Sequence, residues 1–205
     1  MLSHKESSKF VALAEALGAA GMGSVRFDFS GCGESSGPDS GGELIPSRLK
    51  DLHAVVDHVL EEGWCGGGLG LVGSSLGGYL ALLAAAGRSE VRATACWATP
   101  YDLRPIRTAL SNSEELKRRF PPGFRVGEPE DLTGISGPKR VLVIHGRRDE
   151  TVPWTDAGRI YEKVAEPRRL LLFEGADHRF LDEGCRELAV RATVDWFQEM
   201  GVGAE

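Results

Sequence analysis

The chain has 205 residues, with 24 basic and 30 acidic side chains, a formal net charge of −6 and a pI near 5.5. This length supports one well-buried core and is short for two, so we predict a single domain over residues 1–205. The acidic balance argues against a nucleic-acid surface, which needs clustered Lys and Arg. The four cysteines are scattered without a C-x-x-C pair. They indicate neither a zinc site nor a disulfide framework and favour a reducing compartment, the cytoplasm.

A helix and a strand are the first predicted elements. Ser3 and Glu6 form a capping-box pattern, and apolar residues then recur at helical spacing from Phe10 to Leu17. The segment from Ser24 to Phe29 is short, partly β-branched and aromatic, and turn-rich residues follow it, which predicts a strand leading into a long loop. Apolar residues at helical spacing over 49–60 predict an amphipathic helix.

The stretch from Gly63 to Gly87 carries no charged residue. Nine of its residues are glycine and two are serine, which is unlike a membrane span. We interpret it as a loop, a buried strand from Leu69 to Val72, a turn, and a buried helix from Leu76 to Ala86. A further strand from Val91 to Trp97 is predicted next.

The segment 99–138 is rich in charge and proline and interrupts this alternation. We predict a short lid or insertion of one or two small helices there. Alternation resumes with a strand over 140–145, a helix over 154–164, a strand over 168–173 and a final helix over 182–200. Apolar strands alternating with amphipathic helices predict an α/β fold: a doubly wound, mainly parallel sheet of about five strands with helices on both faces.

The turn between the predicted strand and helix at 69–86 contains the G-x-S-x-G pattern, as Gly73-Ser74-Ser75-Leu76-Gly77. A strand that ends in a tight glycine-flanked turn into a helix can hold one serine hydroxyl clear of the backbone, which makes Ser75 the candidate nucleophile. Ser74 is excluded because the residues two positions to either side of it are bulky. The alternative is a purely structural glycine turn.

A serine nucleophile needs a base, and the base needs an acid to orient it. Loops at the carboxyl ends of parallel strands gather along one edge of the sheet. Asp149 lies on the loop after the strand at 140–145, and His178 on the loop after the strand at 168–173. We therefore predict Asp149 as the acid and His178 as the base, in the chain order Ser, Asp, His. The alternatives are a turn or helix-capping role for Asp149 and a surface histidine beside Asp177 for His178.

Other titratable residues are weaker candidates. His145 is the rival base, but its place at the tip of a buried strand, directly before a glycine, favours a hydrogen-bonded structural histidine. The less suitable acids are Glu150, Asp156 and Asp102, and the histidines interpreted as structural or solvated are His4, His53 and His58.

No cofactor and no metal ion are predicted. The run from Gly31 to Ser36 fails the G-x-G-x-x-G pattern at its last position, and no clear phosphate-binding helix follows it. The residues considered for an acyl pocket are Met22, Trp97, Tyr101 and Phe120, with core packing expected for at least half of them.

Four ordered motifs, at 24–35, 73–78, 145–153 and 175–178, resemble the α/β-hydrolase superfamily, in particular its esterase, lipase and serine-aminopeptidase-like branch. The resemblance implies Ser75 as nucleophile, Asp149 as acid and His178 as base, with the backbone N–H of Leu76 as one oxyanion donor. Ser74 departs from the family, in which histidine is common before the nucleophile. We expect that difference to alter the packing of the site more than its mechanism.

The resemblance also implies a buried strand and a His-Gly turn before residues 2–7, and the second oxyanion donor follows that turn. Met1 stands where this donor would be. In the family the strand lies between those that correspond to 24–29 and 69–72. We therefore expect either that these two strands pair directly or that the chain is a shortened form of a longer protein.

The leading functional prediction is a serine hydrolase that cleaves carboxylic esters or thioesters of small to medium acyl groups through an acyl-enzyme on Ser75. Its expected partner is a small-molecule ester or acyl substrate, with no nucleic acid and no membrane span. The alternative is a catalytically weak or inactive hydrolase-like ligand binder, or a shortened isoform, with an incomplete oxyanion hole. Loss of one oxyanion donor typically lowers the rate about 10²- to 10³-fold.

Overall fold

The computed structural model describes residues 4–36, 43–117 and 125–203. Its centre is a four-stranded sheet in the order β1-β2-β3-β4, and every neighbouring pair is parallel. The strands are β1 (Leu69–Ser74), β2 (Val91–Trp97), β3 (Lys139–Gly146) and β4 (Ala165–Phe173). A parallel sheet places the carboxyl ends of all its strands on one edge, so the loops that follow β1, β3 and β4 lie on the same side of the molecule.

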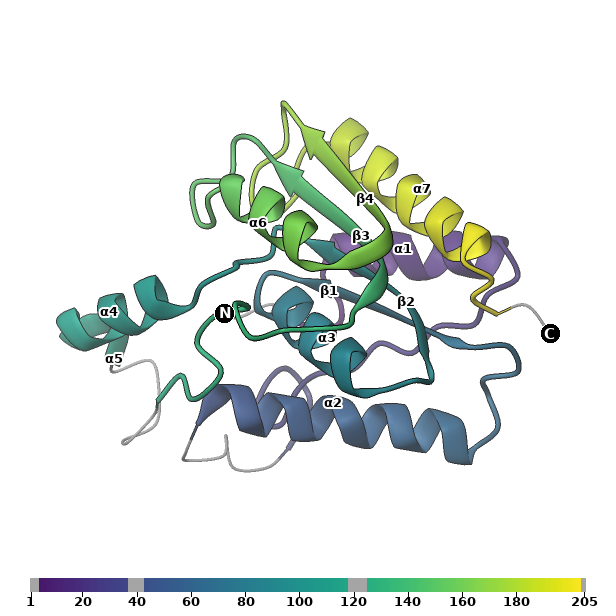
Figure 1. The fold of residues 1–205 in the computed structure, drawn as a ribbon, viewed down its shortest axis with the longest axis horizontal. Helices are drawn as coiled ribbons and strands as arrows, with labels where there is room; N and C mark the ends of the chain where they lie inside the picture. The colour runs from purple at the N-terminus through teal and green to yellow at the C-terminus, as the bar shows by residue number, and fades with distance from the viewer. Residues whose placement is uncertain (1–3, 37–42, 118–124, 204–205) are drawn as a thin grey trace.

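Helices cover both faces of the sheet, as predicted (Figure 1). The helices are α1 (Ser8–Ala19), α2 (Leu44–Glu61), α3 (Leu76–Gly87), α4 (Arg104–Asn112), α5 (Glu114–Lys117), α6 (Thr155–Lys163) and α7 (Glu183–Glu199). Helices α1 and α7 pack on one face, and α2, α3 and α6 supply the core of the other. The doubly wound α/β prediction is therefore confirmed.

Strand β3 shows why its sequence is a continuous apolar run. Val141 and Val143 belong to the core on the face of α3 and α6, whereas Leu142 and Ile144 belong to the core on the face of α1 and α7. All four side chains are essentially inaccessible to solvent. Because successive side chains of a strand point to opposite faces, a strand covered on both faces must be apolar at every position.

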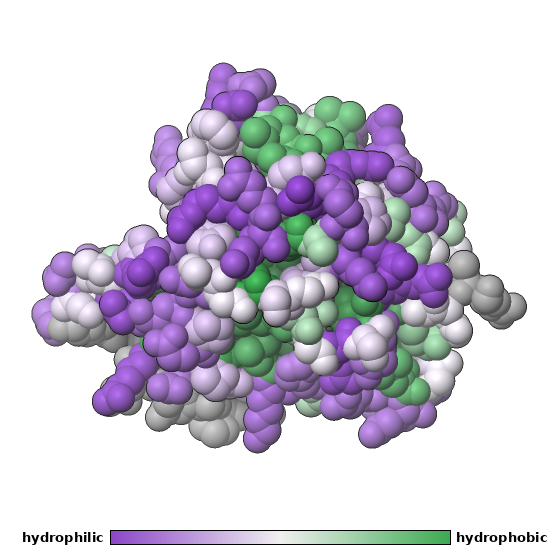
Figure 2. All heavy atoms as spheres, viewed as in Figure 1, coloured by the Kyte–Doolittle hydropathy of each residue, from purple (hydrophilic) through white to green (hydrophobic). Residues whose placement is uncertain are grey.

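The charge-free stretch from Gly63 to Gly87 contains β1 and α3, in agreement with its interpretation as strand, turn and helix. Among the described residues, no helix has both the length and the apolarity needed to cross a bilayer. On the face shown in Figure 2, hydrophilic side chains cover much of the surface, and apolar side chains gather near the centre and in a patch near the top of the view.

Helix α1 begins later than the capping box predicts. Its N-cap is Ser7, whose side chain caps nothing, and Glu6 lies outside the helix with its carboxylate 3.3 Å from the guanidinium of Arg26. Ser3 is outside the described residues. The glutamate of the pattern thus pairs with a residue distant in the sequence and lies outside the helix. Helix α7, by contrast, has a side-chain cap: the Asp182 carboxylate accepts a hydrogen bond of 2.8 Å from the Cys185 backbone N–H.

The predicted strand from Ser24 to Phe29 is wrong, because these residues form no strand. Among the described residues, no backbone hydrogen bond links the segment to β1, so the expected direct pairing of the two is also wrong. A strand requires ladder partners, which propensity alone cannot supply. Side-chain contacts hold the segment instead: Asp28 accepts a hydrogen bond from the Lys5 backbone N–H at 2.7 Å, and Arg26 donates one to the Lys5 carbonyl at 2.5 Å.

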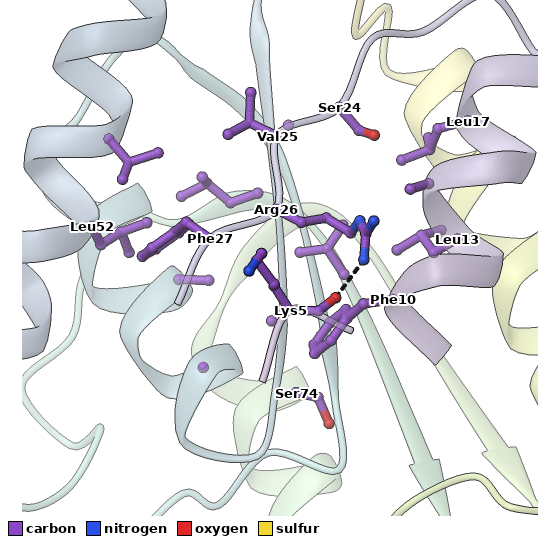
Figure 3. A pocket seen from close by; sticks show the side chains of 18 of the residues that line it. Lys5, Phe10, Leu13, Leu17, Ser24, Val25, Arg26, Phe27, Leu52 and Ser74 are labelled. Carbon is purple, nitrogen blue, oxygen red and sulfur yellow. Dashed lines mark hydrogen bonds between the residues drawn. The ribbon is translucent and has the colours of Figure 1, made fainter. Parts of the chain in front are cut away.

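A cavity of about 1350 Å³ extends between β1 and the segment 24–29. Leu13 of α1 and Leu52 of α2 line it from opposite sides, and Phe27 lies beside Leu52 (Figure 3). The side of β1 opposite β2 carries no further strand among the described residues. This edge is therefore open to the cavity.

One or two small helices were predicted in the segment 99–138, and its described part contains two, α4 and α5, with residues 118–124 outside that part. Its two ends meet at an isolated antiparallel bridge between Asp102 and Asp131. The Leu132 N–H donates to the Tyr101 carbonyl at 3.0 Å, which joins them further. The role of this segment as a lid stays a prediction.

Candidate active site

Ser75 lies in the turn between β1 and α3, at the carboxyl edge of the sheet. Its backbone has φ 56° and ψ −126°, a conformation that residues other than glycine rarely adopt. The turn holds this conformation through a hydrogen bond of 2.8 Å from the Ser75 N–H to the Trp97 carbonyl on β2. It also requires glycine at position 73, where a Cβ atom would lie 2.1 Å from the carbonyl oxygen of Gly77. This close contact explains the glycine two residues before the serine.

The backbone N–H of Leu76 begins helix α3. Among the described residues it has no backbone acceptor, whereas the amides of Gly78 and Tyr79, further along the first turn, donate to the Ser75 carbonyl. A free N–H at a helix N-terminus is available to a negatively charged oxygen. The position implied for the second oxyanion donor, Met1, lies outside the described residues.

Asp149 and His178 are in direct contact. The Nδ1–H of His178 donates to Asp149 Oδ2 at 2.8 Å. The loops that carry the two residues are joined by backbone hydrogen bonds from Arg147 to the Phe173 carbonyl at 2.9 Å and from Arg148 to the Ala176 carbonyl at 3.1 Å. Asp149 and His178 are 29 residues apart in the sequence, and they meet because β3 and β4 are neighbours in the sheet.

The carboxylate of Asp149 is completely buried and well satisfied. Its Oδ1 accepts hydrogen bonds of 2.8 Å from the backbone N–H groups of Thr151 and Val152. Burial raises the pKa of this carboxyl group, but hydrogen bonds from His145, His178 and the Val152 N–H outweigh it and bring the pKa below its ordinary value. Asp149 therefore remains negatively charged at neutral pH, as an acid that orients a histidine must.

His145 is buried and hydrogen-bonded, as predicted, but it contacts the candidate acid as well. Its Nε2 lies 3.1 Å from the Val152 carbonyl oxygen and 3.1 Å from Asp149 Oδ2. Both of these atoms are acceptors, so Nε2 carries the proton. The buried Nδ1 has no partner among the described residues. The contact with Asp149 was not predicted, because it depends on how the loop after β3 turns back on the strand.

Ser75, Leu76 and His178 all line the cavity described above, at one of its ends. Among the described residues, no hydrogen bond joins the hydroxyl of Ser75 to the imidazole of His178. The structure thus brings the predicted acid and base into contact and places the predicted nucleophile in the same cavity. Hydrogen bonds of this kind are often long in enzymes without substrate.

The weaker candidates have other partners. Asp156 accepts a hydrogen bond from the Tyr101 N–H at 2.9 Å, and Asp102 pairs with Arg104. His53 contacts Arg88, His58 lies 4.0 Å from Glu62, and His4 and Glu150 are exposed.

The described acyl-pocket candidates lie in the hydrophobic cores. Met22, Trp97 and Tyr101 are all buried in the two hydrophobic cores, and Met22 also lines the cavity. Phe120 lies outside the described residues. Core packing for at least half of the set was the expectation, and the described members agree with it.

Lys9 is a residue at this site that the sequence did not reveal. It belongs to the first turn of α1, is only 6% exposed, and its Nζ donates a hydrogen bond of 2.6 Å to Ser74 Oγ. A lysine that follows two serines near a helix start is typical of a solvated side chain. The unusual serine at position 74 was the only feature that pointed to a different environment there.

An all-parallel sheet covered on both faces, with a strained serine turn between a strand and a helix, defines the class of α/β hydrolases. The chain belongs to the family described as serine aminopeptidase, S33, whose model matches residues 3–141. The protein is therefore a hydrolase of the α/β type.

Relatives of known sequence and structure agree with this assignment. The mouse mitochondrial palmitoyl-protein thioesterase ABHD10 is 29% identical over 219 residues, which cover 95% of this chain and 71% of that protein. The uncharacterized protein YfhR of Salmonella typhimurium is 31% identical over 161 residues, and the match spans 74% of this chain but only 53% of YfhR. The solved structure of α/β hydrolase domain-containing protein 10 from mouse matches with a TM-score of 0.75 and 26% identity, over 98% of this chain and 87% of that one.

Proposed function

We propose that this protein is a serine hydrolase that cleaves carboxylic esters or thioesters, with Ser75 as nucleophile, His178 as general base and Asp149 as the acid that orients it. The observation that carries the proposal is the 2.8 Å hydrogen bond between His178 Nδ1 and Asp149, beside the cavity that Ser75 lines. The strained backbone of Ser75 supports it, because such strain is typical of a nucleophile held at the tip of a turn.

In the proposed mechanism His178 acts through its second ring nitrogen. Since Nδ1 carries the proton donated to Asp149, Nε2 is free to accept the proton of the Ser75 hydroxyl. The Ser75 oxygen then bonds to the substrate carbonyl carbon, and the Leu76 N–H stabilises the negative charge on the carbonyl oxygen. His178 returns the proton to the leaving alcohol or thiol as the acyl bond breaks. Water, deprotonated by His178, releases the acid in a second round.

The proposed substrates are acyl esters and thioesters because the cavity next to Ser75 is lined by aliphatic side chains such as Leu13, Leu17 and Val56. The name of the mouse relative, a palmitoyl-protein thioesterase, supports the thioester class. The proposal includes a lid role for residues 99–138. The predicted cytoplasmic location also remains a proposal, since the same relative is named as mitochondrial.

Hydrolysis of chromogenic acyl esters and acyl thioesters by the purified chain tests this function. Ser75→Ala is expected to lower kcat by about 10⁴-fold or more, because no other group can form the acyl-enzyme. Ser89→Ala, an exposed serine between α3 and β2, is the matched control and should retain full activity. Equal activity of Ser75→Ala and the control would contradict the proposal.

A ligand binder of low or no activity is the second candidate. Two observations favour it: the cavity is large, and Ser75 makes no hydrogen bond with His178 among the described residues. Calorimetric titration with a non-hydrolysable acyl analogue separates the two functions when it is paired with turnover measurements. Binding without turnover supports the binder, whereas turnover that depends on Ser75 excludes it.

A further inference from the structure

The side chain of Lys9 is buried, and its amine contacts Ser74, the residue before the candidate nucleophile. Its side chain leaves the first turn of α1 and ends at the last residue of β1, where Nζ lies 2.6 Å from Ser74 Oγ. Figure 3 shows Ser74 at the end of the cavity remote from Val25. Lys9, Ser74, Ser75 and His178 all line this cavity. An ammonium group is therefore fixed one residue from the serine on which acyl transfer is proposed to occur.

The surroundings of this amine make its protonation sensitive to pH. Burial, followed by the nearby positive charge of Arg179, lowers the pKa of Lys9 to about 8, while Asp177 and Asp149 oppose the shift. The ring of Phe10 also lies near the amine, with its centroid 5.7 Å from Nζ. Charged groups thus face Lys9 from the loops after β3 and β4, and Ser74 faces it from β1.

We propose that Lys9 is a positioning residue of the hydrolase site: its protonated amine, bonded to Ser74 Oγ, holds the end of β1 in the geometry from which Ser75 attacks. The inference rests on the proposed function of Ser75. A hydrogen bond from a charged donor is roughly twice as strong as a neutral one, so the restraint weakens when the amine loses its proton. Small displacements of reacting groups lower rates up to about 10²-fold, which makes such a restraint consequential.

The sign of the pH effect follows from the nature of the group. Lys9 is protonated below its pKa of about 8 and neutral above it. Attack by Ser75 should therefore be fastest at or below about pH 8, as long as His178 is neutral, and should slow as the pH rises further. A lysine that served packing alone would leave the alkaline side of the profile flat.

The test is the rate at which a fluorophosphonate modifies Ser75, measured from pH 6 to pH 10. Lys9→Met, which keeps the apolar stem, is expected to react about 10- to 100-fold more slowly at pH 7 and to lose the alkaline decline. Lys9→Arg should keep the wild-type rate within a few-fold and extend it beyond pH 9, because a guanidinium remains charged there. Lys50→Met, an exposed lysine on α2, is the matched control.

A double-mutant cycle tests whether Lys9 acts through Ser74. If it does, Ser74→Ala lowers the rate, and adding Lys9→Met lowers it no further. A Lys9→Met protein with the wild-type rate and alkaline decline would overturn the inference while leaving the hydrolase proposal intact. A wild-type chain that is not modified at any pH would overturn the hydrolase proposal itself, and this inference with it. If Lys9→Met does not fold, as judged by its melting, Lys9→Arg decides: an unchanged alkaline decline contradicts the role.

Discussion

Asp149 accepts two backbone N–H groups on one carboxylate oxygen and two imidazole groups on the other. An aspartate that only stabilises a turn needs just the two backbone N–H donors. The turn or capping role considered for Asp149 therefore explains only half of its contacts. The imidazole contacts place its charge between His145 and His178. Its negative charge therefore fixes the orientation of the candidate base.

Asp149→Asn is expected to lower ester hydrolysis by about 10³- to 10⁴-fold, because the amide cannot hold His178 in the tautomer that leaves Nε2 free. Steady-state kinetics with a chromogenic ester at pH 7.5 measures the effect. Glu150→Gln, an exposed neighbour, is the control and should change kcat less than about twofold. A similar loss of activity in both variants would show that the negative charge of the loop matters and that the Asp149–His178 contact does not.

The lowered pKa of Asp149 also predicts how stability depends on pH. A carboxyl whose folded pKa lies below its unfolded value, about 3.9, stabilises the protein fully above that value. This contribution is lost as the pH falls towards the folded pKa. Urea unfolding of wild type and Asp149→Asn should therefore give a difference in free energy that is constant from pH 7 to about pH 5 and shrinks below about pH 4. A difference that grows on acidification would contradict the sign.

Among the elements, the loops after β3 and β4 position the acid and base through one close approach. A Cβ atom at Gly146 would lie 2.1 Å from the carbonyl oxygen of Ala176, so only glycine allows the two loops to meet. Gly158, in α6, is a contrasting case, because a Cβ atom there would have no atom within 4 Å. The geometry of the Asp149–His178 pair thus depends on a backbone contact between two elements.

Gly146→Ala is expected to separate these loops and to lower both the melting temperature and ester hydrolysis, by several degrees and by at least about tenfold. Gly158→Ala should instead leave activity unchanged and raise stability by about 0.5 to 1 kcal/mol, because alanine is the better helix former. Thermal unfolding and kinetics on both proteins measure the contrast. Equal effects of the two substitutions on stability and activity would contradict the proposal that Gly146 allows the two loops to meet.

The comparison of sequence with structure is clearest at the level of elements. Strands were predicted at 69–72, 91–97, 140–145 and 168–173 from their short apolar runs, and the structure has all four, with three of them longer, at 69–74, 139–146 and 165–173. The segment from Ser24 to Phe29 has the same local character but forms no strand, since pairing depends on a neighbour that composition does not reveal. Lys9 was missed for a related reason. Its burial depends on packing between α1 and β1, not on any local pattern.

At the scale of the whole molecule, β1 and β4 are the two edge strands of the described sheet, and the cavity lies beside β1. Strands β2 and β3 are covered on both faces and paired on both edges, whereas β1 borders the cavity that separates it from the segment 24–29. The site residues Ser75 and His178 lie where this cavity meets the carboxyl edge of the sheet. The proposed catalytic residues thus lie between the sheet and the cavity beside β1.

Amide hydrogen exchange should reflect this division. Amides of 94–97 in β2 are expected to exchange only on global unfolding, because both neighbours of the strand pair with it. Amides of 25–29 should exchange at least about 10²-fold faster, since among the described residues they have no backbone acceptors. Mass spectrometry of peptides from the two segments measures the difference. Equal protection would contradict the absence of pairing at the segment 24–29.

The central claim is that Ser75 becomes acylated during turnover with the help of His178 and Asp149. The most direct test is peptide mass mapping after the purified chain is mixed with an excess of acyl thioester and quenched in acid. The account predicts the mass of the acyl group on the peptide that contains Ser75, with none in Ser75→Ala and strongly reduced amounts in His178→Ala. Hydrolysis without acylation of Ser75, or acylation of another residue with Ser75 unmodified, would contradict it.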